Sequence, residues 1–253
     1  MSGHSKWASI KHKKGVVDAK RGQLFTKLIR EITVAAREGG GNPDGNPRLR
    51  TAIERAKQAN MPLENIEKAI KRGTGELEGV TYESCNFEGY GPGGVAIMIE
   101  TLTDNKNRTS AEIRNIFSKK GGNLAGAGSV SWIFKKKGYF LIDKNQISED
   151  EIYTISIEAG AEDIQPTEKN YEILCDPKDF EKIKEVFSKK GIKCEVAEIS
   201  MIPSSKVKLS SEEDVKQLLS LIEALEEHDD VQKVYANFDI SDEMMEKIAS
   251  EIK

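Results

Sequence analysis

The sequence has few of the residues that build cross-linked or metal-bound proteins. It contains three cysteines and three histidines in 253 residues. The cysteines, at Cys85, Cys175 and Cys194, are odd in number, lie far apart and form no CxxC pair, so their spacing suggests neither a disulfide framework nor a zinc site. We therefore expect a reducing compartment, and we expect no metal and no other cofactor.

Long hydrophobic segments are also missing. No run of about 18 apolar residues occurs, which excludes a membrane-spanning helix. The first residues carry Lys6, Lys11, Lys13 and Lys14 without the apolar segment of a secretory signal. Hydrophobic residues at 38% and charged residues at 32% are typical of a soluble globular protein. The sequence thus predicts a cytoplasmic protein without membrane contact, long enough for two or three domains.

The charge is divided unevenly along the chain. The net charge is −4, yet residues 1–75 hold 16 Lys and Arg against 7 Asp and Glu, and residues 76–253 hold 22 against 35. Because a field acts over only about 8 Å at physiological salt, the local excess matters more than the total. Basic clusters are the usual footprint of nucleic-acid binding, so we expect a basic module attached to an acidic body. The alternative is a solvated helical surface with a chance excess of lysine.

Residues 1–75 predict an arm followed by three helices. Residues 1–17 contain no acid and no lasting apolar period, which is typical of an arm that orders on binding. One helix is expected from Asp18 to the glycines at 39–41, a second after the cap Asn46-Pro47, and a third from Pro62 to Gly73. The cations of the first helix are expected to project from the side opposite its apolar face, at Lys20, Lys27, Arg30 and Arg37.

The remainder has the pattern of two α+β domains. A strand at Val95–Thr101, a helix capped by Thr109 with Glu112, and a strand at Ser129–Phe134 predict a β-α-β unit. Its second half is expected downstream, as a strand at 198–202, a helix capped by Ser210 with Glu213, and a strand at 231–238. A complete second set of strands and helices lies between the two halves.

The expected fold class is therefore α+β, with an N-terminal three-helix domain followed by two domains of the split β-α-β, ferredoxin-like type, the second inserted in the first. The expected bounds are 1–75 for the helical domain and its arm, 80–134 with 199–240 for the discontinuous domain, 135–198 for the inserted domain, and 241–253 for a C-terminal helix.

No motif in the sequence predicts an enzyme. Residues 89–94 match the letters GxGxxG, but a strand follows where the dinucleotide fingerprint needs a helix, so we interpret them as a loop. Neither the histidines of the arm nor His228 has a nucleophile nearby in sequence. The triple Lys135-Lys136-Lys137 fits either a second anion-binding patch or protection of a strand edge. We expect neither catalytic residues nor a small-molecule substrate.

The candidate site is the basic arm with its helices. Lysine and arginine supply charges for phosphates, while Trp7 and His12 offer ring faces for an unstacked base. Trp7 could instead anchor the arm on the protein. No set of side chains suited to reading base edges stands out, which favours recognition of backbone and shape. The predicted nucleic-acid-binding residues are Lys6, Trp7, Lys11, His12, Lys13, Lys14, Lys20, Arg21, Lys27, Arg30, Arg48, Arg50, Lys71 and Arg72.

Several motifs resemble those of the YebC/PmpR family, and they follow one another along the whole chain. They include the segments beginning Gly3-His4-Ser5-Lys6-Trp7, Phe25-Thr26-Lys27-Leu28, Asn46-Pro47-Arg48-Leu49-Arg50, Ile70-Lys71-Arg72-Gly73, Glu88-Gly89-Tyr90-Gly91-Pro92 and Gly128-Ser129-Val130. The resemblance implies an N-terminal helical domain, two α+β domains and no assigned catalytic activity.

For function, the resemblance implies two alternatives. Members are described as cytoplasmic DNA-binding regulators of transcription, and others, including a mitochondrial translational activator, as ribosome-associated translation factors. We expect a non-enzymatic nucleic-acid-binding regulator of transcription, with a translation factor that binds ribosomal RNA as the alternative. An arm that carries Trp7 suits the splayed bases of RNA better than duplex DNA. The acidic domains are expected to supply partner contacts, including those of a homo-oligomer.

Overall fold

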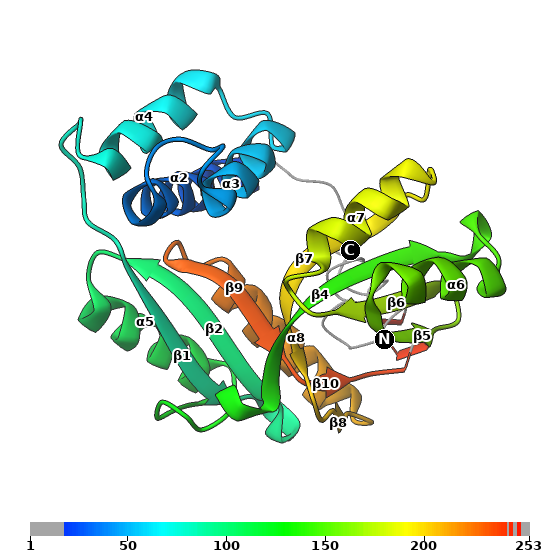
Figure 1. Cartoon of the computed structure of the whole chain (residues 1–253). Helices are drawn as coiled ribbons and strands as arrows, with labels where there is room; N and C mark the ends of the chain where they lie inside the picture. The colour runs from blue at the N-terminus through cyan, green and yellow to red at the C-terminus, as the bar shows by residue number, and fades with distance from the viewer. Residues whose placement is uncertain (1–17, 242, 245–246, 249–253) are drawn as a thin grey trace. The chain divides into compact units, whose positions relative to one another are not determined.

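The computed structural model describes residues 18–241, 243–244 and 247–248, with side chains from residue 21 onward. The chain forms two compact units. One is Trp132–Lys206, and the other joins the described residues up to Ser131 with those from Val207 onward. A helical region precedes antiparallel sheets with their helices, which confirms the predicted α+β class (Figure 1). The arm at 1–17 and most of the helix predicted at 241–253 lie outside the described residues.

The helices expected before residue 75 form a bundle with one apolar core. They are α2 (Asp18–Gly39), α3 (Pro47–Gln58) and α4 (Leu63–Thr74). The predicted cap of α3 is confirmed, because the side chain of Asn46 accepts the N–H of Leu49 at 3.1 Å. The same side chain donates to the carbonyl of Ala35 at 2.7 Å, which fixes the turn between α2 and α3. The core is built from Leu28, Ile32, Leu49, Ala52, Ile66 and Ala69.

The third helix ends later than predicted. It runs through Gly73 and stops at Gly75, whose φ of +83° is the left-handed conformation that ends helices. Gly73 instead permits close packing of α4 on α2. A Cβ at Gly73 would lie 2.4 Å from the carbonyl oxygen of Thr33 and 2.7 Å from the Cβ of Ala36. A glycine that looks like a stop signal is therefore a packing residue.

The rest of this unit is a sheet covered by helices on one face (Figure 1). Its strands are β1 (Glu83–Tyr90), β2 (Ala96–Thr103), β3 (Asn123–Ala125) and β9 (Val231–Ala236), in the order β3-β1-β2-β9 with antiparallel neighbours. The helices are α5 (Lys106–Lys119) and α8 (Glu212–Glu226). A short pair, β8 (Val207–Lys208) and β10 (Phe238–Asp239), completes the unit. Ile97, Ile99, Ile113, Phe117, Leu218 and Ile222 form the core.

The structure corrects three expectations for this unit, one strand and two helix caps, and adds a strand that was not expected. Strand β1 was not predicted, and the strand predicted at Ser129–Phe134 is replaced by the short β3 and a 3₁₀ turn at Ser131–Ile133. The reason is that Glu88 accepts the backbone N–H groups of Gly128, Val130 and Ser131, which a sheet would otherwise use. The predicted helix caps are also displaced. Asn105, not Thr109, caps α5, and Ser211, not Ser210, caps α8.

The unit Trp132–Lys206 is a second sheet with two helices on one face (Figure 1). Its elements are β4 (Phe134–Asp143), α6 (Glu149–Ala159), β5 (Ala161–Pro166), β6 (Asn170–Cys175), α7 (Phe180–Lys189) and β7 (Cys194–Pro203). The strand order is β5-β6-β4-β7. Residues 194–203, which the sequence divided between two domains, form one strand because β7 pairs with β4 along both parts. Phe140, Ile142, Ile173, Ile183 and Phe187 lie in its core.

Candidate nucleic-acid interface

Half of the predicted contact residues lie outside what the structure describes. This holds for Lys6, Trp7, Lys11, His12, Lys13 and Lys14, and for the side chain of Lys20 in α2. The structure divides the others into exposed cations and cations engaged in contacts within the protein.

Exposed cations lie at both ends of the helical bundle. Arg21 lies near the start of α2, at the end where residues 1–17 join, and its Nη2 lies 3.5 Å from the carbonyl of Asn60. At the other end, Arg50 donates to the carbonyl of Pro43 at 3.4 Å. Lys71 and Arg72 are exposed in the last turn of α4. These four side chains remain available to phosphates.

Arg48 is exposed, but its charge is balanced within the bundle. Its Nε lies 2.9 Å from Glu31 and its Nη1 lies 2.5 Å from Glu38. Burial lowers the pKa of Arg48, yet the two carboxylates outweigh burial and raise the pKa above its ordinary value. A phosphate would have to compete with both carboxylates, so Arg48 is a weak candidate for binding.

Contrary to the prediction, Lys27 and Arg30 do not project into solvent. They share one face of α2 with Gln23 and Arg37, at helical spacings of four, three and seven residues. All four donate hydrogen bonds to backbone carbonyls of the α+β part of the unit. This face of α2 is therefore a docking face, and we remove Lys27 and Arg30 from the candidate interface.

The docking face caps the C-terminal end of α8. Lys27 Nζ lies 2.5 Å from the carbonyl of Glu226, and Gln23 Nε2 lies 3.4 Å from that of Glu227. The last carbonyls of a helix have no partner within the helix and carry partial negative charge. Helix α8 has no basic residue in its own last turn. The cation comes instead from α2, far away in sequence.

Next to this contact, Asp230 holds a buried network of charges. Its side chain is 2% exposed, and one of its oxygens pairs with Arg30, whose guanidinium lies 5.2 Å from the centre of the Tyr82 ring. The other oxygen accepts from Thr109 at 2.5 Å, Thr103 at 3.0 Å and Arg108 at 3.0 Å. Burial raises the pKa of Asp230, but these donors outweigh it and hold the pKa at about 2. The carboxylate stays charged and fixes α2 in place.

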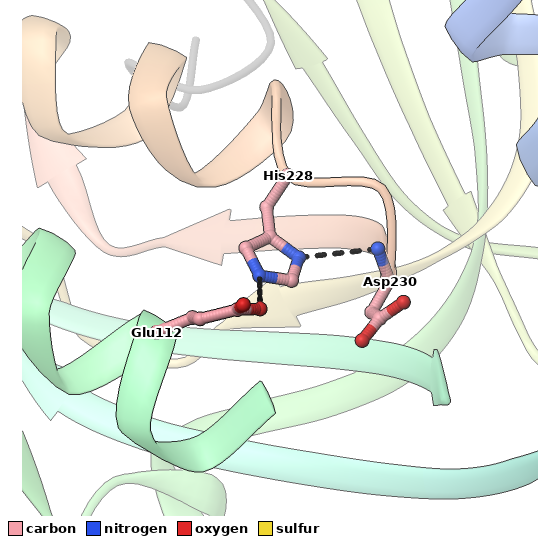
Figure 2. A group of neighbouring side chains, drawn as sticks. All are labelled: Glu112, His228 and Asp230. Carbon is pink, nitrogen blue, oxygen red and sulfur yellow. Dashed lines mark hydrogen bonds and ion pairs between the residues drawn. The ribbon is translucent and has the colours of Figure 1, made fainter. Parts of the chain in front are cut away.

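Glu112, His228 and Asp230 lie close enough together to suggest a metal site (Figure 2). The hydrogen bonds argue against it. The Nδ1 of His228 accepts the N–H of Asp230 at 3.1 Å, and its Nε2 lies 2.9 Å from Glu112. An accepting Nδ1 leaves the ring proton on Nε2, directed at Glu112. The Asp230 oxygens already accept hydrogen bonds from arginines and threonine hydroxyls. The three side chains therefore fit a structural hydrogen-bond network rather than a metal site.

The glycine-rich segment at 89–94 is a tight connection between β1 and β2. A strand lies on each side of it in the chain, so it is not followed by the helix that the dinucleotide fingerprint needs. Gly93 and Gly94 have φ of +70° and +74°, and a Cβ at Gly91 would lie 2.9 Å from Leu218 on α8. These facts support the interpretation as a loop that packs closely rather than a nucleotide site.

Sequence reasoning missed how β1 holds the loop at 126–131. The carboxylate of Glu88 accepts three backbone N–H groups at 2.6 to 2.8 Å, and the hydroxyl of Tyr90 donates to the carbonyl of Ser129 at 3.1 Å. Burial raises the pKa of Glu88, but the N–H donors outweigh burial and lower the pKa below its ordinary value. The only signal in the sequence was the pair of glycines at 126 and 128.

Together, the fold and these contacts define a multidomain α+β protein with a helical basic region docked through α2. The chain belongs to the TACO1/YebC family. The family's N-terminal domain model matches residues 5–76, and the model of its second and third domain matches residues 82–238. The resemblance seen in the sequence is thereby confirmed. Among the described residues, no helix has the length and hydropathy to cross a membrane.

Relatives cover the chain almost completely. A "Probable transcriptional regulatory protein" of Persephonella marina is 58% identical over 250 residues, which span 98% of this chain and all of the relative. One of the same name from Dictyoglomus turgidum is 55% identical over the same shares. The crystal structure of a conserved hypothetical protein from Aquifex aeolicus has 52% sequence identity and a TM-score of 0.79, covering 90% of this chain and 93% of that chain.

Proposed function

We propose that this protein is a non-enzymatic, DNA-binding regulator of transcription. The names of its relatives support a role in transcription. The uneven charge supports contact with a polyanion, because the first 75 residues carry 16 cations against 7 acids. The protein would bind through phosphates and groove shape, with its acidic domains free for partner proteins or a second copy.

The observation that carries this proposal is the separation of the basic residues into two groups. Lys27 and Arg30, which dock α2, are engaged in contacts within the protein. The cations that remain exposed at the two ends of the bundle are Arg21, Arg50, Lys71 and Arg72. Arg21 lies at the end where the basic residues 1–17 are attached. The arm and the ends of the bundle are therefore the proposed DNA contacts.

The first test is the binding of duplex DNA at increasing salt, measured by fluorescence anisotropy. The logarithm of the affinity should fall with the logarithm of salt by about 0.9 for each phosphate neutralised. The triple variant Lys11→Glu, Lys13→Glu, Lys14→Glu should abolish binding with little change in thermal unfolding. The matched control reverses three exposed lysines of the other unit, at 178, 182 and 190, and should bind nearly as well as the wild type. A salt slope near zero, or an arm variant that binds normally, would reject the proposal.

A second experiment separates DNA from RNA as the partner in the cell. The protein is crosslinked in living cells, and both the DNA and the RNA recovered with it are sequenced. Enrichment of discrete promoter regions is the expected result. Enrichment of one contiguous surface of ribosomal RNA, without promoter DNA, would replace the transcriptional role by that of a translation factor.

A further inference from the structure

The unit Trp132–Lys206 displays an exposed tryptophan. Trp132 is 71% exposed, more than any other large hydrophobic side chain in the described part of the chain. An indole normally buries much of its area, because its ring is among the largest apolar surfaces in a protein. Exposure on this scale is typical of a residue that meets a partner.

The backbone that follows Trp132 is held within its own unit. The carbonyl of Ile133 accepts both the N–H and the hydroxyl of Ser204, each at 2.8 Å. Ile133 and Phe134, which follow Trp132, are 6% and 5% exposed. The ring is therefore presented on a rigid backbone, which lowers the entropy cost of binding.

Exposed lysines lie close to this tryptophan in sequence and in strand register, on the paired strands β4 and β7. Strand β4 extends beyond its last pairing with β6 at Gly138, so Lys135 and Lys136 pair only with β7. Both side chains are exposed, and so is Lys206, two residues after the Ser204 that bonds to Ile133. Lys137 differs, because it forms an ion pair with Glu162.

In sequence, the segments that carry these lysines are rich in positive charge. Residues 129–137 and 199–208 contain five lysines and no Asp or Glu, although residues 76–253 as a whole are strongly acidic. Within the described part of the chain, Lys135, Lys136 and Lys206 make no ion pair. Protection of a strand edge would explain lysines on β4, but it would not explain an exposed tryptophan beside them.

We propose that Trp132 with Lys135, Lys136 and Lys206 is a second nucleic-acid contact, specific for unpaired strands. The indole would stack on one splayed base, and the ammonium groups would bind the flanking phosphates. A duplex hides the faces of its bases, so this surface fits single-stranded rather than double-stranded nucleic acid. The inference rests on the proposed function and extends it, because it adds an unpaired strand to the duplex bound by the arm.

The test uses the fluorescence of Trp132 in the full-length protein. The chain has two tryptophans, so Trp7→Phe leaves Trp132 as the sole indole. Titration with a single-stranded thymidine 12-mer should quench this fluorescence. A 12-mer of abasic sites, which keeps the phosphates and lacks the bases, should bind more weakly and leave the fluorescence unquenched. Equal quenching by both would mean that no base stacks on the ring, and would overturn the proposal.

Variants then separate stacking from charge. Trp132→Ala should weaken binding of the 12-mer by between about 5-fold and about 150-fold, and Trp132→Phe should restore part of the loss. Replacing Lys135, Lys136 and Lys206 by Gln should flatten the salt dependence by about 2 in log-log slope. The same change at 178, 182 and 190 is the matched control. If neither set of variants changes binding of the 12-mer, the surface is assigned to a protein partner and the proposal fails.

A parallel titration separates the single-strand contact at Trp132 from duplex binding by the arm. Duplex DNA is titrated in parallel, and Trp132→Ala should leave duplex affinity nearly unchanged. Duplex binding without quenching by the 12-mer would reject this inference and leave the proposed function intact. Quenching by the 12-mer without duplex binding would reject the DNA-binding function and keep the single-strand contact.

Discussion

Among individual residues, Asp230 shows how the environment decides the role of a charged side chain. The sequence places it in an acidic run, where a solvated carboxylate is expected. In the structure it is buried beneath α2 and accepts hydrogen bonds from two arginines and two hydroxyls. Arg30 is its counterpart, since a residue predicted to bind phosphate is instead neutralised by this carboxylate. The charges of both residues therefore serve the fold.

We predict that Asp230→Asn destabilises the protein by about 3 to 5 kcal/mol at pH 7. The amide keeps the size of the side chain but leaves Arg30, which is 13% exposed, without its counter-ion. Urea denaturation measures the change. Asp229→Asn is the matched control, because Arg30 contacts only the backbone carbonyl of that exposed residue, and the substitution should cost less than about 0.5 kcal/mol.

The lowered pKa of the same carboxylate predicts that the stability of the protein depends on pH in the acid range. The pKa of Asp230 is about 2 in the folded protein, against about 3.9 in an unfolded chain. A lowered folded pKa stabilises the protein above the unfolded pKa, and that stabilisation is lost as the pH falls from about 4 toward 2. The stability gap between wild type and Asp230→Asn should narrow by roughly 2 kcal/mol over this range. A gap that stays constant would contradict the assigned network.

At the level of helices and strands, the sequence predicted elements whose signals are local. The cap at Asn46 and the apolar periods of α2 and α3 depend on neighbours in sequence, and all were found where expected. The strand predicted at Ser129–Phe134 was wrong because the carboxylate of Glu88 lies some forty residues earlier in the sequence. It accepts the N–H groups that would have formed the hydrogen bonds of a β-sheet. Tertiary contacts of this kind leave no periodic signal in the chain.

The docking face of α2 shows the same limit for the candidate site. An amphipathic pattern separates the apolar face from the polar face, but it does not say whether water, nucleic acid or another domain covers the polar face. Lys27 and Arg21 look equivalent in the sequence. The structure distinguishes them, because the ammonium of Lys27 meets the carbonyl of Glu226 and Arg21 remains exposed.

The close packing of α4 on α2 leads to a prediction with a matched control. Gly73→Ala should destabilise the protein by about 1 to 3 kcal/mol, because the added methyl group meets the carbonyl oxygen of Thr33, 2.4 Å away. Gly22→Ala makes the same change in α2, where nothing lies within 4 Å of the new Cβ, and should stabilise by up to about 1 kcal/mol. Thermal unfolding of both variants measures the two shifts. If Gly73→Ala were also stabilising, helix propensity would outweigh packing at Gly73 and the predicted clash would be rejected.

For the whole molecule, the division into two compact units has a direct consequence for folding. The unit Trp132–Lys206 contains a closed apolar core of its own, between one sheet and the helices α6 and α7. Its two ends come together, because Phe134 pairs with Pro203 and Ser204 bonds to Ile133. A segment whose ends meet can be inserted into a loop of another domain without straining it.

We therefore predict that residues 132–206 fold when expressed alone. About 75 residues are enough for a marginally stable core. The fragment should unfold cooperatively on heating, followed by far-ultraviolet circular dichroism. Phe140→Ala should abolish this transition, because the ring is fully buried and stacks on Phe180 at 4.9 Å, and such losses cost about 3 to 5 kcal/mol. Ile157→Ala, at a side chain that is 63% exposed, should leave the transition in place. A fragment without a cooperative transition would mean that the core of this unit depends on the rest of the chain.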